Sequence, residues 1–161
     1  MRSALAAAVF RAALLDAGIK DIEIESGGLY AAAGTPADPR ALAAARLADL
    51  DLEPHRARLV NDELAGRFDA IFVMDRLQAL ELLQRFPAAR GKTFALGACL
   101  PGLPRIDISD PYLSDDEESA RILSLVASRA AAVARTIAPG PSILAAEQTP
   151  QRPREAPRDA P

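Results

Sequence analysis

The chain has 161 residues; half of them are hydrophobic, 25% are charged, and the formal net charge is −3. A chain of this length predicts one domain that buries a substantial core. The small net charge and the 4% of aromatic residues argue against nucleic acid as a partner. With one cysteine, Cys99, and one histidine, His55, the chain lacks the ligands for a disulfide or a cysteine-based metal cluster. We expect no cofactor.

The N-terminal segment has only a superficial likeness to a signal peptide. Arg11 interrupts the apolar run that follows Arg2, and Asp16 closes it. No stretch reaches the roughly 18 apolar residues that a membrane span requires. The low cysteine content fits a reducing compartment. We therefore expect a soluble, cytoplasmic protein without membrane insertion.

The first half of the chain predicts two helices and one strand. Residues 3–17 are rich in Ala and Leu, and Gly18 stands where a glycine often caps a helix C-terminus. Within residues 22–26, uncharged side chains alternate with acidic ones, which predicts a short strand with one solvated face. Asp38, followed by proline, predicts the N-cap of a helix over residues 40–50.

The second half alternates predicted helices and strands. Residues 69–74 form a nearly continuous apolar run, which is typical of a strand buried on both faces of a parallel sheet. Residues 92–96 predict another short strand. Helices are expected to begin at residues 61–62, to cover residues 76–86, and to run from residue 114, with an acidic first turn, to near residue 137.

This alternation predicts an α/β domain with a parallel sheet, whose ligands bind at the carboxyl ends of the strands. Only three segments are convincing strands, one fewer than we expect for a doubly wound sheet. The domain is expected to cover residues 1–138. Residues 139–161 are polar and contain repeated prolines, and we expect them to form a disordered tail.

A series of short segments resembles the low-molecular-weight protein-tyrosine phosphatases, in order and at plausible separations from residue 2 to about residue 137. They are Arg2–Ser3 before an Ala-rich helix, residues 26–28 (Ser-Gly-Gly), 34–40 (Gly-Thr-Pro-Ala-Asp-Pro-Arg), 55–58 (His-Arg-Ala-Arg), 73–75 (Val-Met-Asp) and 110–112 (Asp-Pro-Tyr). Residues 87–93, 96–97 and 107–117 resemble the bacterial exopolysaccharide-associated branch. Members of that branch dephosphorylate a membrane tyrosine autokinase.

The resemblance implies a three-layer αβα fold with a parallel sheet in the strand order 2-1-3-4. It also implies a phosphate-binding loop that runs Cys, five residues, Arg, Ser. Counting six positions back from Arg2 passes beyond Met1, so the nucleophilic cysteine and the first strand are not among these residues. We expect either that the true start of the chain lies upstream or that the gene is truncated within this loop.

The resemblance assigns catalytic roles to three residues. Arg2 would bind the phosphoryl oxygens and stabilise the transition state. Ser3 would hydrogen-bond the thiolate and help it leave in the second step. Asp110 would protonate the departing tyrosine oxygen and then activate water against the phosphocysteine.

The same resemblance places four further residues around the site. Tyr112 and Tyr30 would line the entrance and stack on the substrate ring. Ser26 and His55 would support the shape of the phosphate loop from behind. Without the resemblance, a histidine such as His55 is more often a structural residue, and Tyr30 is explained as the cap of a loop.

Cys99 and Arg105 also have the Cys-x5-Arg spacing. Two prolines between them remove backbone donors that should face a phosphate. Ile106 stands where the family has Ser or Thr, and no helix is predicted to begin there. We therefore expect that Cys99 is not the nucleophile.

The leading hypothesis is a protein-tyrosine phosphatase that acts through a phosphocysteine intermediate on a phosphotyrosine protein, such as a tyrosine autokinase of exopolysaccharide export. The alternative is a catalytically dead remnant or pseudophosphatase without the nucleophilic cysteine. An arsenate reductase would need further cysteines to relay oxidation, which the single Cys99 does not provide. A protein-arginine phosphatase stays open, because the loop residue that would distinguish it is not among these residues.

Overall fold

The computed structural model describes residues 1–137 of the chain. In chain order, the elements are α1 (Arg2–Asp16), α2 (Pro39–Leu47), α3 (Asp62–Arg67), β1 (Ile71–Val73), α4 (Arg76–Arg85), the 3₁₀ turn η1 (Pro87–Ala89), β2 (Thr93–Ala95), the 3₁₀ turn η2 (Pro111–Leu113) and α5 (Asp116–Ile137). The predicted tail at residues 139–161 lies outside the described residues. No described helix is both long enough and apolar enough to cross a membrane.

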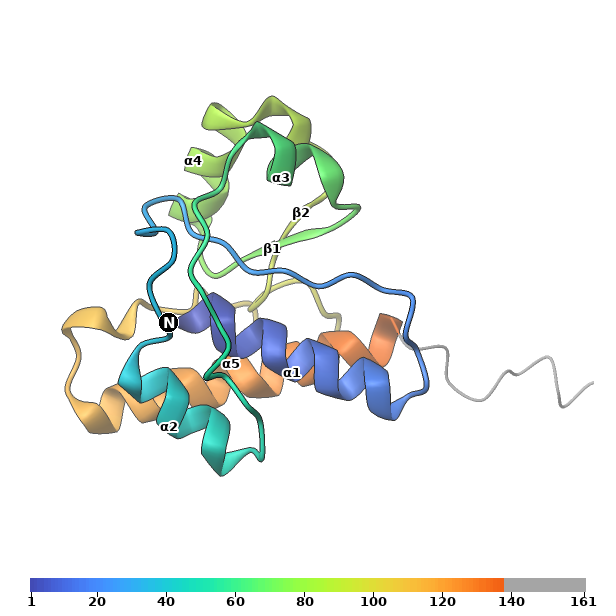
Figure 1. Cartoon of the computed structure of the whole chain (residues 1–161). Helices are drawn as coiled ribbons and strands as arrows, with labels where there is room; N and C mark the ends of the chain where they lie inside the picture. Colours follow the sequence, from blue (N-terminus) through green and yellow to red (C-terminus); the bar gives the residue numbers. More distant parts are fainter. Residues whose placement is uncertain (138–161) are drawn as a thin grey trace, which may run out of the picture.

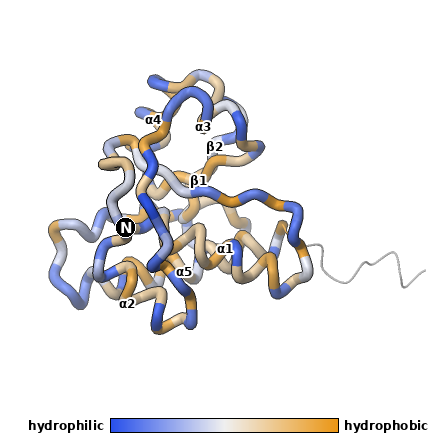
Figure 2. The backbone as a smooth tube through the Cα atoms, viewed as in Figure 1, coloured by the Kyte–Doolittle hydropathy of each residue, from blue (hydrophilic) through white to orange (hydrophobic). Residues whose placement is uncertain are grey.

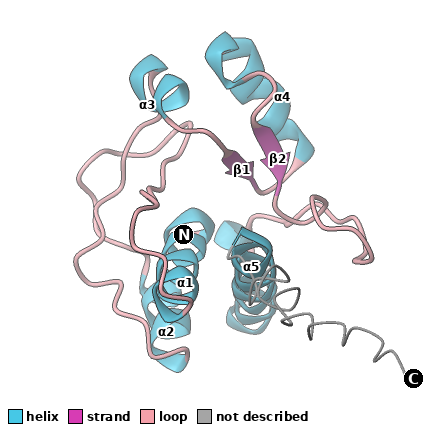
Figure 3. Ribbon diagram, turned by 90° about the vertical axis from the view of Figure 1, so that its right-hand side faces the viewer, coloured by secondary structure: helices cyan, strands magenta, loops and turns pink. Residues whose placement is uncertain are grey.

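The elements form three layers around a small parallel sheet, as predicted. β1 and β2 pair in parallel, with Ile71 opposite Thr93 and Val73 opposite Ala95. Helices α1, α2 and α5 lie on one side of these strands, and α3 and α4 lie on the other (Figures 1 and 3). The layers meet near the N-terminus of α1, so residues at the carboxyl end of β1 face the start of that helix.

The strand predicted at residues 22–26 is wrong. This segment is extended but pairs with no strand of the described residues, and the nearest ladder contact is an isolated bridge between Gly28 and Leu59. The acidic side chains of the segment form ion pairs instead: Glu25 pairs with Arg58 at 2.5 Å and with Arg67 at 3.0 Å. The alternating pattern thus marks an extended segment, but a strand also needs a neighbouring backbone.

Helix ends follow local signals in the sequence. The expected glycine cap of α1 is confirmed: Gly18 has φ +77°, and the N–H of Ile19 donates to Leu14 O at 2.9 Å. The predicted extension of α2 to residue 50 is wrong, because Asp49 adopts φ +54° and the N–H of Leu50 donates to Ala45 O at 2.9 Å. This second cap ends α2 at Leu47 without a glycine.

Two apolar clusters hold the layers together. The larger one joins α1 to α5 and to the chain that follows β2, and its fully buried members include Leu5, Leu123 and Ile108. The smaller one packs α3 and α4 against β1 through Ala65, Val73, Leu82, Phe86 and Ala89. Apolar residues accordingly run through β1 and along α1 (Figure 2). The packed α1–α5 pair fixes the start of α1, where the candidate site lies.

Candidate active site

Arg2, the first residue of α1, is the centre of the candidate site. Its side chain is only 7% exposed, and its guanidinium contacts two segments, at Asp75 and at residues 108–110, that lie far from it in the sequence. Nη1 donates to the backbone carbonyl of Ile108 and lies 3.5 Å from Asp75 Oδ2. Nη2 donates to Asp110 Oδ2 at 3.1 Å. The fork-shaped cation therefore joins the start of α1 to the end of β1 and to the loop before α5.

The two carboxylate oxygens of Asp110, the predicted general acid, have different hydrogen-bond partners, one in the loop and one in Arg2. Its Oδ1 accepts the N–H of Tyr112 at 3.1 Å and so caps the turn η2. Its Oδ2 accepts from Arg2, while the side chain as a whole is 63% exposed. Tyr112 is 71% exposed beside it. The carboxylate thus lies at the surface, next to a buried cation and an exposed aromatic ring.

Asp75 and Arg40 also belong to this site, although the matching segments assign them no role. Asp75 follows β1; its Oδ1 accepts the N–H of Gln78 at 2.8 Å, and its Oδ2 faces Arg2. Arg40, in the first turn of α2, donates to carbonyls of the Asp110 loop. Asp75 has a usable signal, since it stands at the carboxyl end of a predicted parallel strand. The only signal for Arg40 is its place in the matching segment at residues 34–40.

His55 lies close to the start of α1. Burial lowers the pKa of His55, and the positive charges of the N-terminal amine, Arg11 and Arg56 lower it further. Burial also lowers the pKa of the N-terminal amine, while the carboxylates of Asp38 and Asp110 act in the opposite direction. Ionisable groups from several segments therefore surround the α1 N-terminus, and His55 is among them.

The structure does not connect the two predicted serines to the site by hydrogen bonds within the described residues. Ser3 follows Arg2 on α1 and is half-buried. Ser26 is half-buried in the extended segment that leads to the Gly28 bridge. Within residues 1–137, neither hydroxyl makes a hydrogen bond to the Arg2, Asp75 and Asp110 cluster. Their supporting roles therefore stay predictions.

Tyr30 packs against α4 and not against the Asp110 loop. Its hydroxyl donates to the Glu81 carboxylate, and the Arg85 guanidinium lies 5.6 Å from the ring centroid. The hydrogen bond to Glu81 raises the pKa of Tyr30, whose side chain is 81% exposed. In the described part of the chain, no hydrogen bond joins Tyr30 to Arg2 or Asp110. Of the two tyrosines, only Tyr112 belongs to the loop of Asp110.

Cys99 lies in a different environment from Arg2. Its thiol points to Leu96 O at 3.7 Å, and the side chain packs against the larger apolar cluster. Burial raises the pKa of the Cys99 thiol, whereas a catalytic cysteine needs a lowered pKa to provide a thiolate. Residues 105–109 form no helix. These features support the prediction that the Cys99–Arg105 spacing is not a phosphate-binding loop.

No group of three or more His, Cys, Asp or Glu side chains within residues 1–137 is arranged to hold a metal ion. The polar groups gathered at Arg2 are instead one buried guanidinium, two carboxylates and a backbone carbonyl. A guanidinium at a helix N-terminus, with acidic side chains that an incoming anion can displace, can bind a phosphate group.

Comparison with known proteins agrees with this chemistry. The model of the low molecular weight phosphotyrosine protein phosphatase family matches residues 1–140. The chain is 37% identical over 100 residues to a probable low molecular weight protein-tyrosine-phosphatase, EpsP, of Ralstonia nicotianae, covering 62% of this chain and 66% of EpsP. It is 32% identical over 110 residues to the phosphatase Wzb of Escherichia coli K12, covering 66% of this chain and 70% of Wzb.

The fold is also similar to a solved structure, that of Vibrio vulnificus Wzb in complex with benzylphosphonate. The two structures superpose with a TM-score of 0.73 at 29% sequence identity, covering 84% of this chain and 90% of the other. The sequence match to EpsP spans slightly less than two thirds of that protein's length. The match to the family model includes the segments that carry Arg2, Asp75 and Asp110.

Proposed function

Because the chain belongs to the low molecular weight phosphotyrosine protein phosphatase family, on the exopolysaccharide-associated branch with EpsP and Wzb, we propose that it hydrolyses phosphotyrosine in proteins. The observation that carries the proposal is the contact between buried Arg2 and exposed Asp110, 3.1 Å apart at the start of α1. A phosphate-binding cation beside a carboxyl group that faces solvent is what the cleavage of an aryl phosphate requires.

Arg2 supplies the phosphate-binding half of this proposal. A cation at a helix N-terminus is opposed by the helix dipole, and here the carboxylates of Asp75 and Asp110 offset that cost. A phosphate dianion would be favoured at the same place by both the guanidinium and the dipole. Its oxygens would take over the Nη2 donor from Asp110, which would leave the Asp110 carboxyl group available for proton transfer.

The proposed reaction has two steps. A cysteine thiolate attacks phosphorus, the bond between phosphorus and the tyrosine oxygen breaks, and Asp110 gives its proton to the departing oxygen. Asp110 then takes a proton from water, whose oxygen attacks the phosphocysteine and breaks the P–S bond, releasing phosphate and the thiolate. Arg2 holds the phosphoryl oxygens in both steps, and Ser3 is proposed to hydrogen-bond the leaving thiolate. Cys99, packed against the core, is not the nucleophile of this scheme.

The substrate side of the proposal depends on Tyr112. This ring is exposed and follows Asp110 by two residues, so it can cover an aromatic ring whose phosphate is held by Arg2. The complex of Vibrio vulnificus Wzb with benzylphosphonate, in which a methylene group joins a phosphonate to an aromatic ring, supports such a ligand. The similarity to EpsP and Wzb supports a membrane tyrosine autokinase of exopolysaccharide export as the phosphotyrosine protein.

The test measures hydrolysis of an aryl phosphate by two proteins: the chain of 161 residues, and the same chain extended through the upstream reading frame. We expect turnover in the extended protein, a loss of about 100-fold or more with Asp110→Asn, and no loss with Cys99→Ser. Activity of the shorter protein that disappears with Cys99→Ser would refute the placement of the site.

A pseudophosphatase is the second candidate, favoured by the environment of the one cysteine, whose thiol contacts Leu96 O and packs against the larger apolar cluster. It predicts that neither protein turns over while a phosphotyrosine peptide still binds, and that Arg2→Met abolishes this binding. Failure of both hydrolysis and binding would reject the phosphotyrosine proposal altogether.

A further inference from the structure

The loop that carries Asp110 has few apolar contacts of its own. Within residues 110–114, only Pro111 is buried, while Tyr112 and Leu113 are 71% and 93% exposed. The turn η2 is one 3₁₀ turn, closed by the N–H of Ser114 donating to Pro111 O at 3.1 Å. Short turns of this kind are weakly stable alone. The position of the Asp110 carboxylate therefore depends on what holds the loop from outside.

Arg40 is the side chain that holds it. Its Nη1 donates to Pro111 O at 3.0 Å and to Ser114 O at 3.4 Å, and its Nη2 lies 3.5 Å from Tyr112 O. Three of the loop's carbonyls thus face one guanidinium. Hydrogen bonds with a charged donor are stronger than neutral ones, and the planar fork of Arg can serve several acceptors at fixed angles.

The guanidinium is itself held at both ends. Its Nε lies 3.3 Å from Asp38 Oδ1, the carboxylate that also caps α2 through the N–H of Arg40 at 2.9 Å. Its Nη1 donates to Ser119 Oγ at 3.1 Å, and this hydroxyl, only 1% exposed on α5, donates in turn to Pro111 O at 3.2 Å. The contacts of Arg40 and Ser119 therefore connect α2, α5 and the loop.

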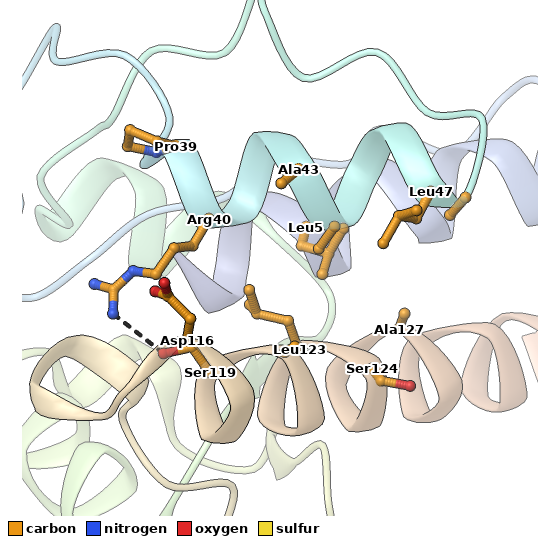
Figure 4. Close-up of a pocket in the computed structure, with 13 residues that line it drawn as sticks. Leu5, Pro39, Arg40, Ala43, Leu47, Asp116, Ser119, Leu123, Ser124 and Ala127 are labelled. Carbon is orange, nitrogen blue, oxygen red and sulfur yellow. Dashed lines mark hydrogen bonds between the residues drawn. The ribbon is translucent and has the colours of Figure 1, made fainter.

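This polar connection stands at one end of an open groove between α2 and α5. The groove has a volume of about 550 Å³ and is lined mainly by small and apolar side chains, among them Leu5, Ala43, Leu123 and Ala127. In Figure 4, Arg40 reaches from α2 across this end of the groove to Ser119 on α5. Because apolar packing between the two helices is incomplete here, the Arg40 hydrogen bonds set their spacing next to the loop.

We propose that Arg40, together with Ser119, is a positioning residue that fixes the Asp110 loop at the active site. The inference rests on the proposed function, because it gives Arg40 a role through Asp110. Arg40 touches neither the phosphate nor the reacting atoms in this proposal. It determines where the general acid and Tyr112 stand when Arg2 turns from Asp110 to a phosphate.

The first test does not need catalysis. In the chain of 161 residues, amide hydrogen exchange is measured by NMR at Tyr112, Leu113 and Ser114 for wild type, Arg40→Lys and Arg40→Gln. Both variants should raise exchange at these amides about 10-fold or more, because lysine has no fork to serve three carbonyls. Arg46→Gln, on the same helix but in an exposed pair with Glu53, is the matched control and should change nothing there.

Ser119→Ala is the second variant, for the case in which Arg40→Gln does not fold. It removes the hydroxyl that bridges Arg40 and Pro111 O, so a smaller rise in exchange is expected at the same amides. Unchanged exchange in a folded Arg40→Gln protein, or in Ser119→Ala where Arg40→Gln does not fold, would overturn the proposal.

The second test separates positioning from general destabilisation. In the protein that turns over, Arg40→Gln should reduce kcat/KM, which reports on ester cleavage and not on the later hydrolysis of the phosphocysteine, about 10-fold more for phenyl phosphate, whose leaving group needs protonation, than for 2,4-dinitrophenyl phosphate, whose leaving group does not. Equal losses with both esters would contradict a role through Asp110. If the wild type hydrolyses neither ester, the proposed function fails, and hydrogen exchange alone decides whether Arg40 fixes the loop.

Discussion

Replacing Arg2 by Met tests whether the contacts of the candidate site also stabilise the fold. The change removes a buried guanidinium and leaves the carbonyl of the fully buried Ile108 without its donor, which costs about 1–3 kcal/mol. Loss of the 3.5 Å contact to half-buried Asp75 adds roughly 1 kcal/mol. The contact to Asp110 adds at most about 1 kcal/mol, because that carboxylate is mostly exposed. We therefore expect a loss of about 2–5 kcal/mol in the free energy of unfolding.

The assay is urea unfolding followed by circular dichroism, since the chain has no tryptophan. Arg11→Met is the control on the same helix: its guanidinium is exposed and makes one bond, to Ile24 O at 2.8 Å, so it should cost less than about 1 kcal/mol. Inorganic phosphate should raise the unfolding midpoint of the wild type and of Arg11→Met, but not that of Arg2→Met. Equal stability of the Arg2 and Arg11 variants would refute the structural reasoning.

Three further predictions concern the surroundings of the site. Burial lowers the pKa of His55 in the folded state. The contribution of His55 to the free energy of unfolding is therefore complete above its unfolded pKa of about 6.5 and declines as the pH falls through the folded pKa. The urea midpoint should fall less between pH 7.5 and 5.5 in His55→Gln than in the wild type. A Cβ on Gly97 would meet Ile106 O at 2.2 Å, so Gly97→Ala should destabilise the protein by about 1–3 kcal/mol. Gly66→Ala in helix α3, where a Cβ has open space, should be neutral or stabilising by up to about 1 kcal/mol. Equal unfolding midpoints for the two variants would disprove this. Burial raises the pKa of the Cys99 thiol, so iodoacetamide at pH 7.5 should modify it more slowly than free N-acetylcysteine, and a faster reaction would mean an activated thiolate.

Local features of the fold were predictable because their causes are local. Asp38, Asn61 and Asp75 each precede a helix, and each side chain accepts a backbone N–H of the first turn. Such caps depend on residues two or three positions away, which the sequence displays directly. The same holds for Gly18, whose left-handed conformation few other residues adopt readily.

Features that depend on distant partners were harder to predict. The pattern at residues 22–26 correctly indicates an extended backbone, but whether it becomes a strand depends on a neighbour elsewhere in the chain. The end of α2 was missed for a different reason, since Asp49 takes a conformation for which glycine or asparagine is the usual signal. One error comes from missing long-range information, the other from an uncommon residue in a common cap.

The candidate site likewise combines residues that could be predicted from the sequence with residues that only the structure identifies. Arg2 and Asp110 could be named from matching segments, although 108 positions separate them. Asp75 and Arg40 contribute to the site through contacts 73 and 71 positions away, with Arg2 and with Pro111 O, and the sequence marks them only by their places after a predicted strand and in a matching segment. Tyr30 differs from these residues: the resemblance implies a place for it at the substrate entrance, and its observed contacts are with Glu81 and Arg85 on α4.

The two networks around Asp110 are linked by the proposed reaction. Without phosphate, Asp110 is held from one side by Arg2 and through its loop by Arg40. Phosphate binding would take the Arg2 contact away, since the dianion competes for the same Nη2 donor. The hold of Arg40 and Ser119 on Pro111 O would then be the main polar support of the loop at the moment when Asp110 must deliver its proton. A carboxylate that exchanges one partner during the reaction needs a second support that does not take part in it, and Arg40 lies where that support is required.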